Sequence, residues 1–130
     1  MLSWQTVVAV GSGGFLGAVL RVYINGLISH KFPHDLPYGT LGVNLIGSFI
    51  MGVLIAYFMY TTLFSVHMKS FLTTGILGAL TTYSTFAIES FLLIKGGSIG
   101  LAFLNISLNS IGTIIMAGAG YLLVHSLFKS

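Results

Sequence analysis

Cysteine is absent from this 130-residue sequence, and charged residues make up only 5% of it. The lack of cysteine excludes disulfides and thiolate chemistry, and it leaves no cysteine signal of the redox compartment. Soluble domains usually carry about 25% charged residues, so the surface of this chain would not remain in water. The few basic residues are scattered along the chain instead of forming a basic face, which argues against a nucleic-acid partner. The chain is therefore expected to lie in a lipid bilayer.

Long apolar stretches fill almost the whole chain, of which 55% is hydrophobic. A helix needs about 20 mostly apolar residues to cross the ~30 Å hydrocarbon core of a bilayer. The first of these stretches lacks the basic start of a signal peptide and is too long for its apolar region, so it is interpreted as a retained span. The sequence predicts an all-α integral membrane protein in which residues 1–130 form a single four-helix transmembrane domain. The four predicted spans are 4–29, 38–60, 69–94 and 98–128.

The basic residues that flank the four spans are balanced between the two sides of the membrane. The side of the N-terminus holds Lys69 and Lys129. The opposite side holds Lys31 and Lys95, together with Arg21 if its side chain reaches outward. The positive-inside rule therefore has almost nothing to act on. Two interpretations stay open: the chain inserts in both orientations and pairs with an inverted copy, or one residue such as Arg21 fixes a single topology.

Small residues occur at the four-residue spacing at which membrane helices contact one another. The sequence contains 17 glycines, and small residues let two backbones approach closely where hydrophobicity cannot drive association. The pairs at this spacing are Gly13 with Gly17, Gly96 with Gly100, and Ser48 with Gly52. They predict a tightly packed bundle. Because four short helices make a poor pore alone, an oligomer is also expected.

Polar side chains lie deep inside the predicted spans, where they are costly unless they are paired or face a cavity. Asn44 lies in the second span, on one helical face with Ser48 and Met51. A polar stripe in the fourth span repeats at helical spacing and comprises Asn105, Asn109, Gly112, Thr113 and Met116. Both faces are candidates for a polar pathway across the membrane.

The third span is dense in glycine and threonine at its middle, where a membrane helix should be most regular. Residues 75–86 read GILGALTTYSTF, a composition that favours a local break. A break exposes backbone amides and carbonyls at membrane depth, which is tolerated only where these groups are buried in protein or line a cavity or an ion site. The third helix is therefore expected to be broken at mid-membrane.

A second explanation is that these polar groups serve only the fold. Hydroxyls would then bond to carbonyls of their own helix, and asparagines would clamp neighbouring helices. For Ser107 and Ser110 taken alone, this explanation is favoured. For Asn44, the third-span segment and the stripe of Asn109 and Thr113 taken together, a polar pathway is favoured.

The candidate lining groups offer hydrogen-bond donors and almost no acids. Of the two carboxylates, Asp35 is placed in a connection and Glu89 close to the end of the third span. A cation pathway or a proton-coupled exporter would normally carry carboxylates among its lining residues. A donor-rich and acid-poor pathway suits a small anion instead.

Three segments carry a resemblance to a known family. They are GGFLGAVLR at 13–21, GTLGVNLIG at 39–47 and GILGALTTYSTF at 75–86. Together they resemble the Fluc (CrcB) fluoride ion channels, with three of the four helices matched in order. The resemblance implies an antiparallel dual-topology homodimer with two pores. Such a dimer exports fluoride passively from the cytoplasm across the cell inner (plasma) membrane.

The resemblance also implies roles for individual pore residues. Asn44 would donate its amide to the ion, and Tyr83 and Phe86 would present their ring edges to it. Tyr83 departs from the family, in which phenylalanine is usual, and adds a hydroxyl inside the pore. The implied polar track comprises Ser84, Thr85, Asn109 and Thr113.

Two further sites are implied by the same resemblance. Arg21 matches a basic residue at the end of the first span and would lie in the vestibule. The backbone carbonyls of Gly78 and Thr81, contributed by both subunits, would hold a structural Na⁺ at the centre of the dimer. Carbonyl oxygens without carboxylates suit a hard monovalent cation. Ala79 stands beside this break where the family has a second glycine.

Other functions are disfavoured because the residues that they need are missing. A small multidrug exporter, which also has four helices and dual topology, needs a carboxylate in its first span, and residues 4–29 contain none. A non-transporting assembly subunit would not need a break in the third span. An enzyme would need a nucleophile with its base or a metal cluster. The histidines do not supply one, since they lie in connections or at span ends: His30, His34, His67 and His125.

Overall fold

The computed structural model describes residues 2–32 and 35–130, and within these ranges all regular structure is helical. Four helical segments are long and apolar enough to cross a membrane: Trp4–Lys31, Tyr38–Tyr60, Val66–Lys95 and Ile99–Lys129. The predicted all-helical architecture with four candidate membrane spans is confirmed. His34, one of the histidines considered above, lies outside the described residues.

The first two spans are single helices, and the last two are assembled from several helical elements. The first span is α1 (Trp4–Lys31) and the second is α2 (Tyr38–Tyr60). The third span consists of α3 (Val66–Ser70), the π-helix η1 (Phe71–Leu77), α4 (Gly78–Leu80) and α5 (Tyr83–Lys95). The fourth span consists of α6 (Ile99–Ser107), the π-helix η2 (Leu108–Gly112) and α7 (Thr113–Lys129).

Serine hydroxyls decide where two of the spans begin. Ser3 accepts a hydrogen bond from Thr6 N at 3.2 Å and caps α1. Ser65 accepts one from Met68 N at 3.2 Å, so α3 begins before the lysine that marked the predicted boundary. An N-cap hydroxyl satisfies an amide that the first turn leaves unpaired. The cap therefore locates the start of this helix better than the nearest charge does.

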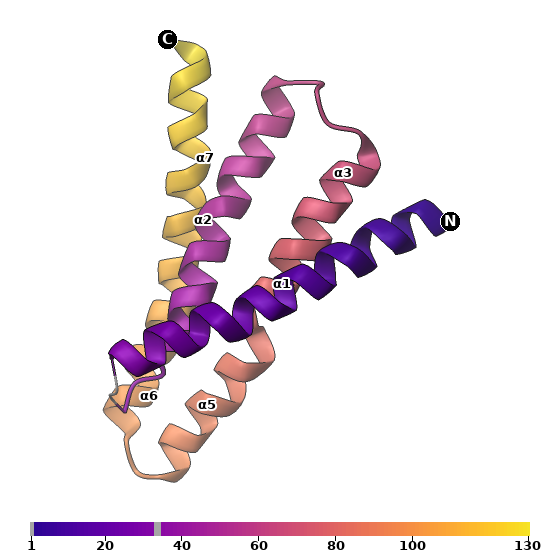
Figure 1. Cartoon of the computed structure of the whole chain (residues 1–130). Coiled ribbons are helices and arrows are strands. Elements are labelled where there is room, and N and C mark those ends of the chain that lie inside the picture. Colours follow the sequence, from indigo (N-terminus) through magenta and orange to yellow (C-terminus); the bar gives the residue numbers. More distant parts are fainter. Residues whose placement is uncertain (1, 33–34) are drawn as a thin grey trace.

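The spans are arranged as a bundle in which α1 is the most oblique member (Figure 1). α7 runs alongside α2, and α1 crosses the bundle and packs against η1 and α4. α5 and α6 form a hairpin whose turn contains Gly97 at a φ of 86°, which residues other than glycine rarely adopt. Gly96 and Gly100 form no close helix contact within the chain, because Gly96 caps the end of α5 and Gly100 has open space around it.

α1 contacts the third span through a small-residue pair that the sequence predicts. Gly13 and Gly17 are both buried, and a Cβ atom on either would collide with a backbone carbonyl of η1, that of Phe71 or that of Ile76. Gly14, on a different face of α1, has open space around it. The GxxxG spacing therefore marks a direct backbone contact between α1 and η1.

α2 and α7 are held together in the same manner. A Cβ atom on Gly52 of α2 would collide with the Ala117 carbonyl, and one on Gly120 of α7 would collide with the Phe49 carbonyl. Each helix thus places a glycine against a carbonyl of the other. This reciprocal contact fixes the fourth span against the second and sets the distance between them.

Much of the apolar surface of the single chain is exposed. Large apolar side chains on the outer faces of all four spans are open to the surroundings. The buried hydrophobic cluster is small and consists of Val43, Leu77 and Leu80, with Ile24, Met51 and Leu54 packed against it. This distribution suits lipid or a second chain as the neighbour of the bundle.

Candidate ion pathway

The third span is interrupted between α4 and α5. Thr81 and Thr82 have extended backbones, with ψ values of 153° and 111°. The Thr81 hydroxyl donates to the Leu77 carbonyl at 2.9 Å and so stabilises the end of α4. The Thr82 hydroxyl accepts a hydrogen bond from Thr85 N at 3.3 Å and caps the start of α5. Threonine side chains that bond to nearby backbone groups compete with helix continuation, which explains why the interruption falls at this pair.

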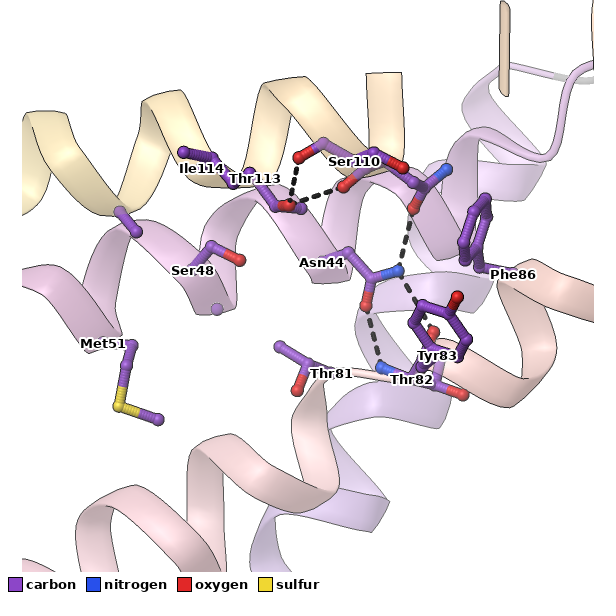
Figure 2. Close-up of a pocket in the computed structure, with 13 residues that line it drawn as sticks. Asn44, Ser48, Met51, Thr81, Thr82, Tyr83, Phe86, Ser110, Thr113 and Ile114 are labelled. Carbon is purple, nitrogen blue, oxygen red and sulfur yellow. Dashed lines mark hydrogen bonds between the residues drawn. The ribbon is translucent and has the colours of Figure 1, made fainter. Parts of the chain in front are cut away.

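Asn44 of α2 supplies the backbone hydrogen bonds that the interruption removes (Figure 2). Thr82 N donates to Asn44 Oδ1 at 2.8 Å, and Asn44 Nδ2 donates to the Thr82 carbonyl at 3.1 Å. In a continuous helix Thr82 N would instead donate to the Gly78 carbonyl. The reciprocal pair satisfies both polar groups of one residue in a place that lipid surrounds. Asn44 is therefore a clamp between α2 and the third span.

A cavity of about 480 Å³ lies beside the interruption, between α2, α5 and the fourth span. None of its lining residues carries a carboxylate or a fixed positive charge. The structure brings together in it Asn44, Tyr83, Phe86, Asn109 and Thr113 from the predicted pore residues, with Thr81 of the predicted cation site. The remaining lining residues are Gly47, Ser48, Met51, Thr82, Ser110, Ile114 and Ala117.

Some hydroxyls in this cavity already make hydrogen bonds within the protein, and others do not. Thr113 Oγ1 donates to the Asn109 carbonyl at 2.5 Å and to the Ser110 carbonyl at 3.1 Å. Among the residues that the structure describes, the hydroxyls of Ser48 and Ser110 have no hydrogen-bond partner. The expectation that Ser110 bonds to its own helix is therefore wrong, because its side chain lies on the cavity wall. The Tyr83 hydroxyl likewise has no partner among the described residues, so the residues that line the cavity offer three uncommitted hydroxyl donors.

Tyr83 and Phe86 form the aromatic part of the cavity wall. Their ring centroids are 5.3 Å apart and their planes are inclined by 79°, which is an edge-to-face arrangement. Phe86 is 7% exposed and is held by its neighbours, whereas Tyr83 is 79% exposed. The outer side of the cavity is therefore formed by a ring that only lipid or another chain would cover.

The other predicted track residues do not line this cavity. Ser84 is exposed and is not part of its wall. Thr85 lines a second cavity, of about 400 Å³, together with Arg21 and Asn25 of α1. Thr82 lines both cavities, so the interruption separates them. Arg21 thus lies near the interruption at a second opening, which is compatible with a vestibule.

The carbonyls considered for a cation lie at the two ends of α4. Gly78 is the first residue of this helix and is exposed, and Thr81 follows its last residue. Because Thr82 N donates to Asn44, it is not available to the Gly78 carbonyl. In residues 2–32 and 35–130, no three His, Cys, Asp or Glu side chains are grouped to hold a metal ion. A cation here would be coordinated by backbone carbonyl oxygens, and such ligands fit a hard monovalent ion.

Both carboxylates of the chain lie apart from the donor-lined cavity. Glu89 Oε1 accepts a hydrogen bond from Thr40 Oγ1 of α2 at 2.5 Å. Glu89 and Asp35 line a separate cavity of about 230 Å³. The acid-poor character that the sequence predicts for the pathway is therefore preserved in the folded chain.

Sequence reasoning placed Asn105 on the polar stripe of the fourth span but missed Ser90 and the buried contact between the two, which lies behind the cavity and not on its wall. Ser90 of α5 and Asn105 of α6 are 5% and 0% exposed, and Asn105 Nδ2 donates to Ser90 Oγ at 2.9 Å. The available signal was spacing, since each residue lies one helical turn from a predicted pore residue, Phe86 or Asn109. The bond gives a buried amide and a buried hydroxyl a partner in each other, as buried polar groups require.

The sequence matches known proteins along nearly its whole length. Residues 8–121 match the family profile described as CrcB-like protein, Camphor Resistance (CrcB). A protein of Sulfurimonas denitrificans named fluoride-specific ion channel FluC is 72% identical over 123 residues, which cover 95% of each chain. Proteins of the same name from Nautilia profundicola and Methanocaldococcus jannaschii are 47% and 44% identical, each over 128 residues that cover at least 96% of both chains.

Proposed function

The chain belongs to the CrcB-like protein family, and from this membership we propose that it is a fluoride-specific ion channel and not an enzyme. The resemblance identified in the sequence is confirmed by the relatives. Fluoride moves passively, driven by its gradient and by the membrane potential. The observation that supports this function best is the cavity beside Thr81 and Thr82, whose wall combines hydrogen-bond donors with aromatic rings and contains no carboxylate.

The chemistry of the wall suits a small and strongly hydrated anion. Fluoride gives up its water only where close donors replace it, and hydrogen bonds to a charged partner are stronger than neutral ones. The uncommitted hydroxyls of Ser48 and Ser110 are the first such donors. The edge of an aromatic ring is the positive part of its quadrupole, so Tyr83 and Phe86 can face the ion as well. A larger halide gains less from short hydrogen bonds and needs a wider path.

Asn44 can serve both as a pore residue that binds the ion and as the clamp between α2 and the third span. One of its N–H groups donates to Asn109 Oδ1 at 2.9 Å and the other to the Thr82 carbonyl at 3.1 Å. An arriving fluoride ion is a stronger acceptor than a neutral carbonyl, and it takes over the N–H group that Thr82 holds. Thr82 N stays bonded to Asn44 Oδ1 during this exchange, so the backbone amide at the interruption keeps its partner while the ion passes.

The assembly that we propose is an antiparallel, dual-topology homodimer with two pores, one for each chain. Three observations support it: the balanced basic residues at the two membrane surfaces, the extensive apolar exposure of the single chain, and the 79% exposure of Tyr83 at the mouth of the cavity. A second copy would cover this ring and complete the pore wall. The interruption of the third span would then lie at mid-membrane, next to its counterpart.

At the centre of this dimer we place a structural Na⁺. The carbonyls of Gly78 and Thr81 would hold it, since the first is freed from Thr82 N and both lie next to the interruption. Each chain offers two such oxygens, so the two chains together would offer four backbone carbonyls, the ligand type that coordinates monovalent cations in channel filters. The ion would fix the two interruptions relative to each other without taking part in fluoride movement.

The protein would act in the cell inner (plasma) membrane as a multi-pass protein and export fluoride from the cytoplasm. Purified protein in liposomes loaded with fluoride tests the function directly, with chloride-loaded liposomes as the control. Fluoride efflux should follow the membrane potential, while chloride efflux should equal that of empty liposomes. A requirement for a proton gradient would indicate a coupled exporter, and an absence of flux would indicate an assembly subunit; either result contradicts the channel.

A further inference from the structure

A series of hydrogen bonds leads away from the interruption into the protein, and every donor in it points in the same direction. Thr82 N donates to Asn44 Oδ1 at 2.8 Å. Asn44 Nδ2 donates to Asn109 Oδ1 at 2.9 Å, and Asn109 Nδ2 donates to Asn105 Oδ1 at 3.0 Å. All four residues are buried. The series therefore connects the third span to α2 and then to the fourth span through buried side chains.

The series continues back to α5 and ends on its backbone. Asn105 Nδ2 donates to Ser90 Oγ at 2.9 Å, and the Ser90 hydroxyl donates to the Phe86 carbonyl at 2.8 Å. Asn109 Nδ2 also donates to the backbone carbonyl of Asn105, at 3.0 Å. Neither Ser90 nor Asn105 lines the cavity. Both stand behind its wall, in contact with residues that do line it.

The two ends of the series allow only one direction for its hydrogen bonds. Thr82 N can only donate, and the Phe86 carbonyl can only accept. A side-chain amide can exchange its oxygen and nitrogen by rotating through half a turn. If Asn109 did so, its oxygen would face the two oxygens of Asn105, and its NH₂ group would face the NH₂ group of Asn44. Such contacts leave buried donors and acceptors unpaired, at a cost of about 1–3 kcal/mol each.

We propose that Ser90 and Asn105 are positioning residues of the pore. They fix the orientation of the Asn109 amide from behind the wall, and through it they make Asn44 present its NH₂ group, rather than its oxygen, to the ion path. An oxygen in that place would repel an anion. The inference concerns the same cavity as the proposed function and rests on it for its effect on fluoride, but the orientation of the two amides can be measured separately.

Side-chain amide signals provide that measurement. The asparagines of the chain are Asn25, Asn44, Asn105 and Asn109, so selective ¹⁵N-asparagine labelling gives four NH₂ signals. In Ser90→Ala, the signals of Asn109 and Asn44 should move together with that of Asn105, and the Asn25 signal should stay in place. A shift confined to Asn105 would overturn the proposal, because it would show that Ser90 packs locally and positions nothing beyond its neighbour.

A matched control and a rescue variant separate positioning from general damage. Ser12 Oγ donates to the carbonyl four residues earlier, that of Val8, at 2.7 Å, as Ser90 Oγ does, but it lies on the exposed part of α1. Ser12→Ala should leave all four signals unchanged, and Ser90→Thr, which keeps the hydroxyl, should restore the parental pattern. If Ser90→Ala does not assemble, Ser90→Cys replaces it, since the thiol has a similar volume and is a weak hydrogen-bonding group.

Fluoride efflux from liposomes is the functional readout. Ser90→Ala should lower the rate by about three- to tenfold, the loss expected from one weakened hydrogen bond, while Ser90→Thr and Ser12→Ala should keep it. A parental rate in folded Ser90→Ala would overturn the positioning role. If the parent protein itself carries no fluoride, the proposed function fails, whereas the amide signals still decide whether Ser90 orients Asn109 and Asn44.

Discussion

The third and fourth spans both depart from regular α-helical geometry, but they do so in opposite ways. The third span stops at Leu80 and restarts at Tyr83, and the groups that this opens are satisfied by Asn44 of another helix. The fourth span stays continuous through η2, so its backbone groups need no partner from another helix, although the side chains of Asn105 and Asn109 bond to Ser90 and Asn44. The backbone of the third span therefore depends on a tertiary contact, whereas the backbone of the fourth span does not.

The third and fourth spans also contribute different groups to the cavity. The third span contributes backbone groups and aromatic rings next to an interruption, where we propose that hydrogen bonds are exchanged for contacts with fluoride. The fourth span contributes Asn109, Ser110 and Thr113 from a continuous helical surface. Substitutions in the clamp of the third span should therefore have larger effects than substitutions inside the fourth span.

The largest effect is expected for Asn44→Ala. This change removes a donor to the ion and leaves Thr82 N without its partner. A hydrogen bond to a charged group contributes roughly 1.5–3 kcal/mol, so fluoride efflux should fall by about ten- to a hundredfold. Liposome efflux measures the rate, and gel filtration in detergent checks that the assembly persists. A parental rate in an intact assembly would mean that Asn44 is a clamp and nothing more.

The contact between α1 and the third span is tested by Gly17→Ala. The added methyl group meets the Ile76 carbonyl, a backbone atom that cannot move aside. Overpacking of this kind destabilises a protein by about 1–3 kcal/mol, which should lower the thermal midpoint in detergent. Gly14→Ala is the matched control, since Gly14 has open space around it. Equal thermal midpoints for the two variants would show that the close contact of the GxxxG pair does not contribute to stability.

The corresponding contact of the fourth span is tested by Gly52→Ala. Its methyl group meets the Ala117 carbonyl, and the destabilisation should again be about 1–3 kcal/mol. Gly118→Ala, in open space on α7, is the control. Because the fourth span has no interruption to misalign, Gly52→Ala should leave fluoride over chloride selectivity unchanged in the protein that folds. A change in selectivity would show that both spans depend on their neighbours to the same degree.

Two substitutions of Tyr83 distinguish the contribution of its hydroxyl from that of its aromatic ring. Tyr83→Phe keeps the ring, so efflux should change by less than about tenfold and remain selective. Tyr83→Ile removes the hydroxyl together with the polarised ring edge and should lower the rate much further. Liposome efflux of both variants, compared at equal protein content, distinguishes the two contributions. Parental efflux in a Tyr83→Ile variant that folds and assembles like the parent would assign the ring a packing role and leave the aromatic contact to Phe86.

The smallest effect is expected for Thr113→Val in the fourth span. The valine keeps the shape and loses a hydroxyl that is already committed to the Asn109 carbonyl. One net hydrogen bond is worth about 0.5–1.5 kcal/mol, and most of it is local to the helix, so efflux should fall by no more than about threefold. Ser110→Ala, which removes an uncommitted hydroxyl, should lower the rate more. The reverse order would place the ion nearer to Thr113 than to Ser110.

The four spans and part of the cavity wall could be predicted from the sequence because they are local properties. Hydrophobic length gives the four spans, and helical spacing groups Asn109 with Thr113 on one face. The threonine-rich composition of residues 75–86 likewise indicates where regular helix is least favoured. Each of these signals is carried by residues that are near one another in the chain.

The partners of these groups could not be predicted in the same way. Asn44 and Thr82 are separated by 38 positions, and nothing local in either segment shows that they bond to each other. Ser84 and Thr85 belong to the same motif as Phe86, yet the turn of α5 directs them away from the main cavity. The π-helices were also not foreseen, since a wider turn leaves the composition and the apolar pattern of a span almost unchanged.

The clamp between Asn44 and Thr82 has a consequence for the third span in isolation. Without Asn44 of α2, the Thr82 amide of an interrupted span would have no partner in hydrocarbon, which is strongly unfavourable. A peptide of residues 66–95 in lipid should therefore form a continuous helix in which Thr82 N bonds to the Gly78 carbonyl. The interruption is thus a property of the assembled bundle, because only the neighbouring helix supplies the second partner for Thr82 N.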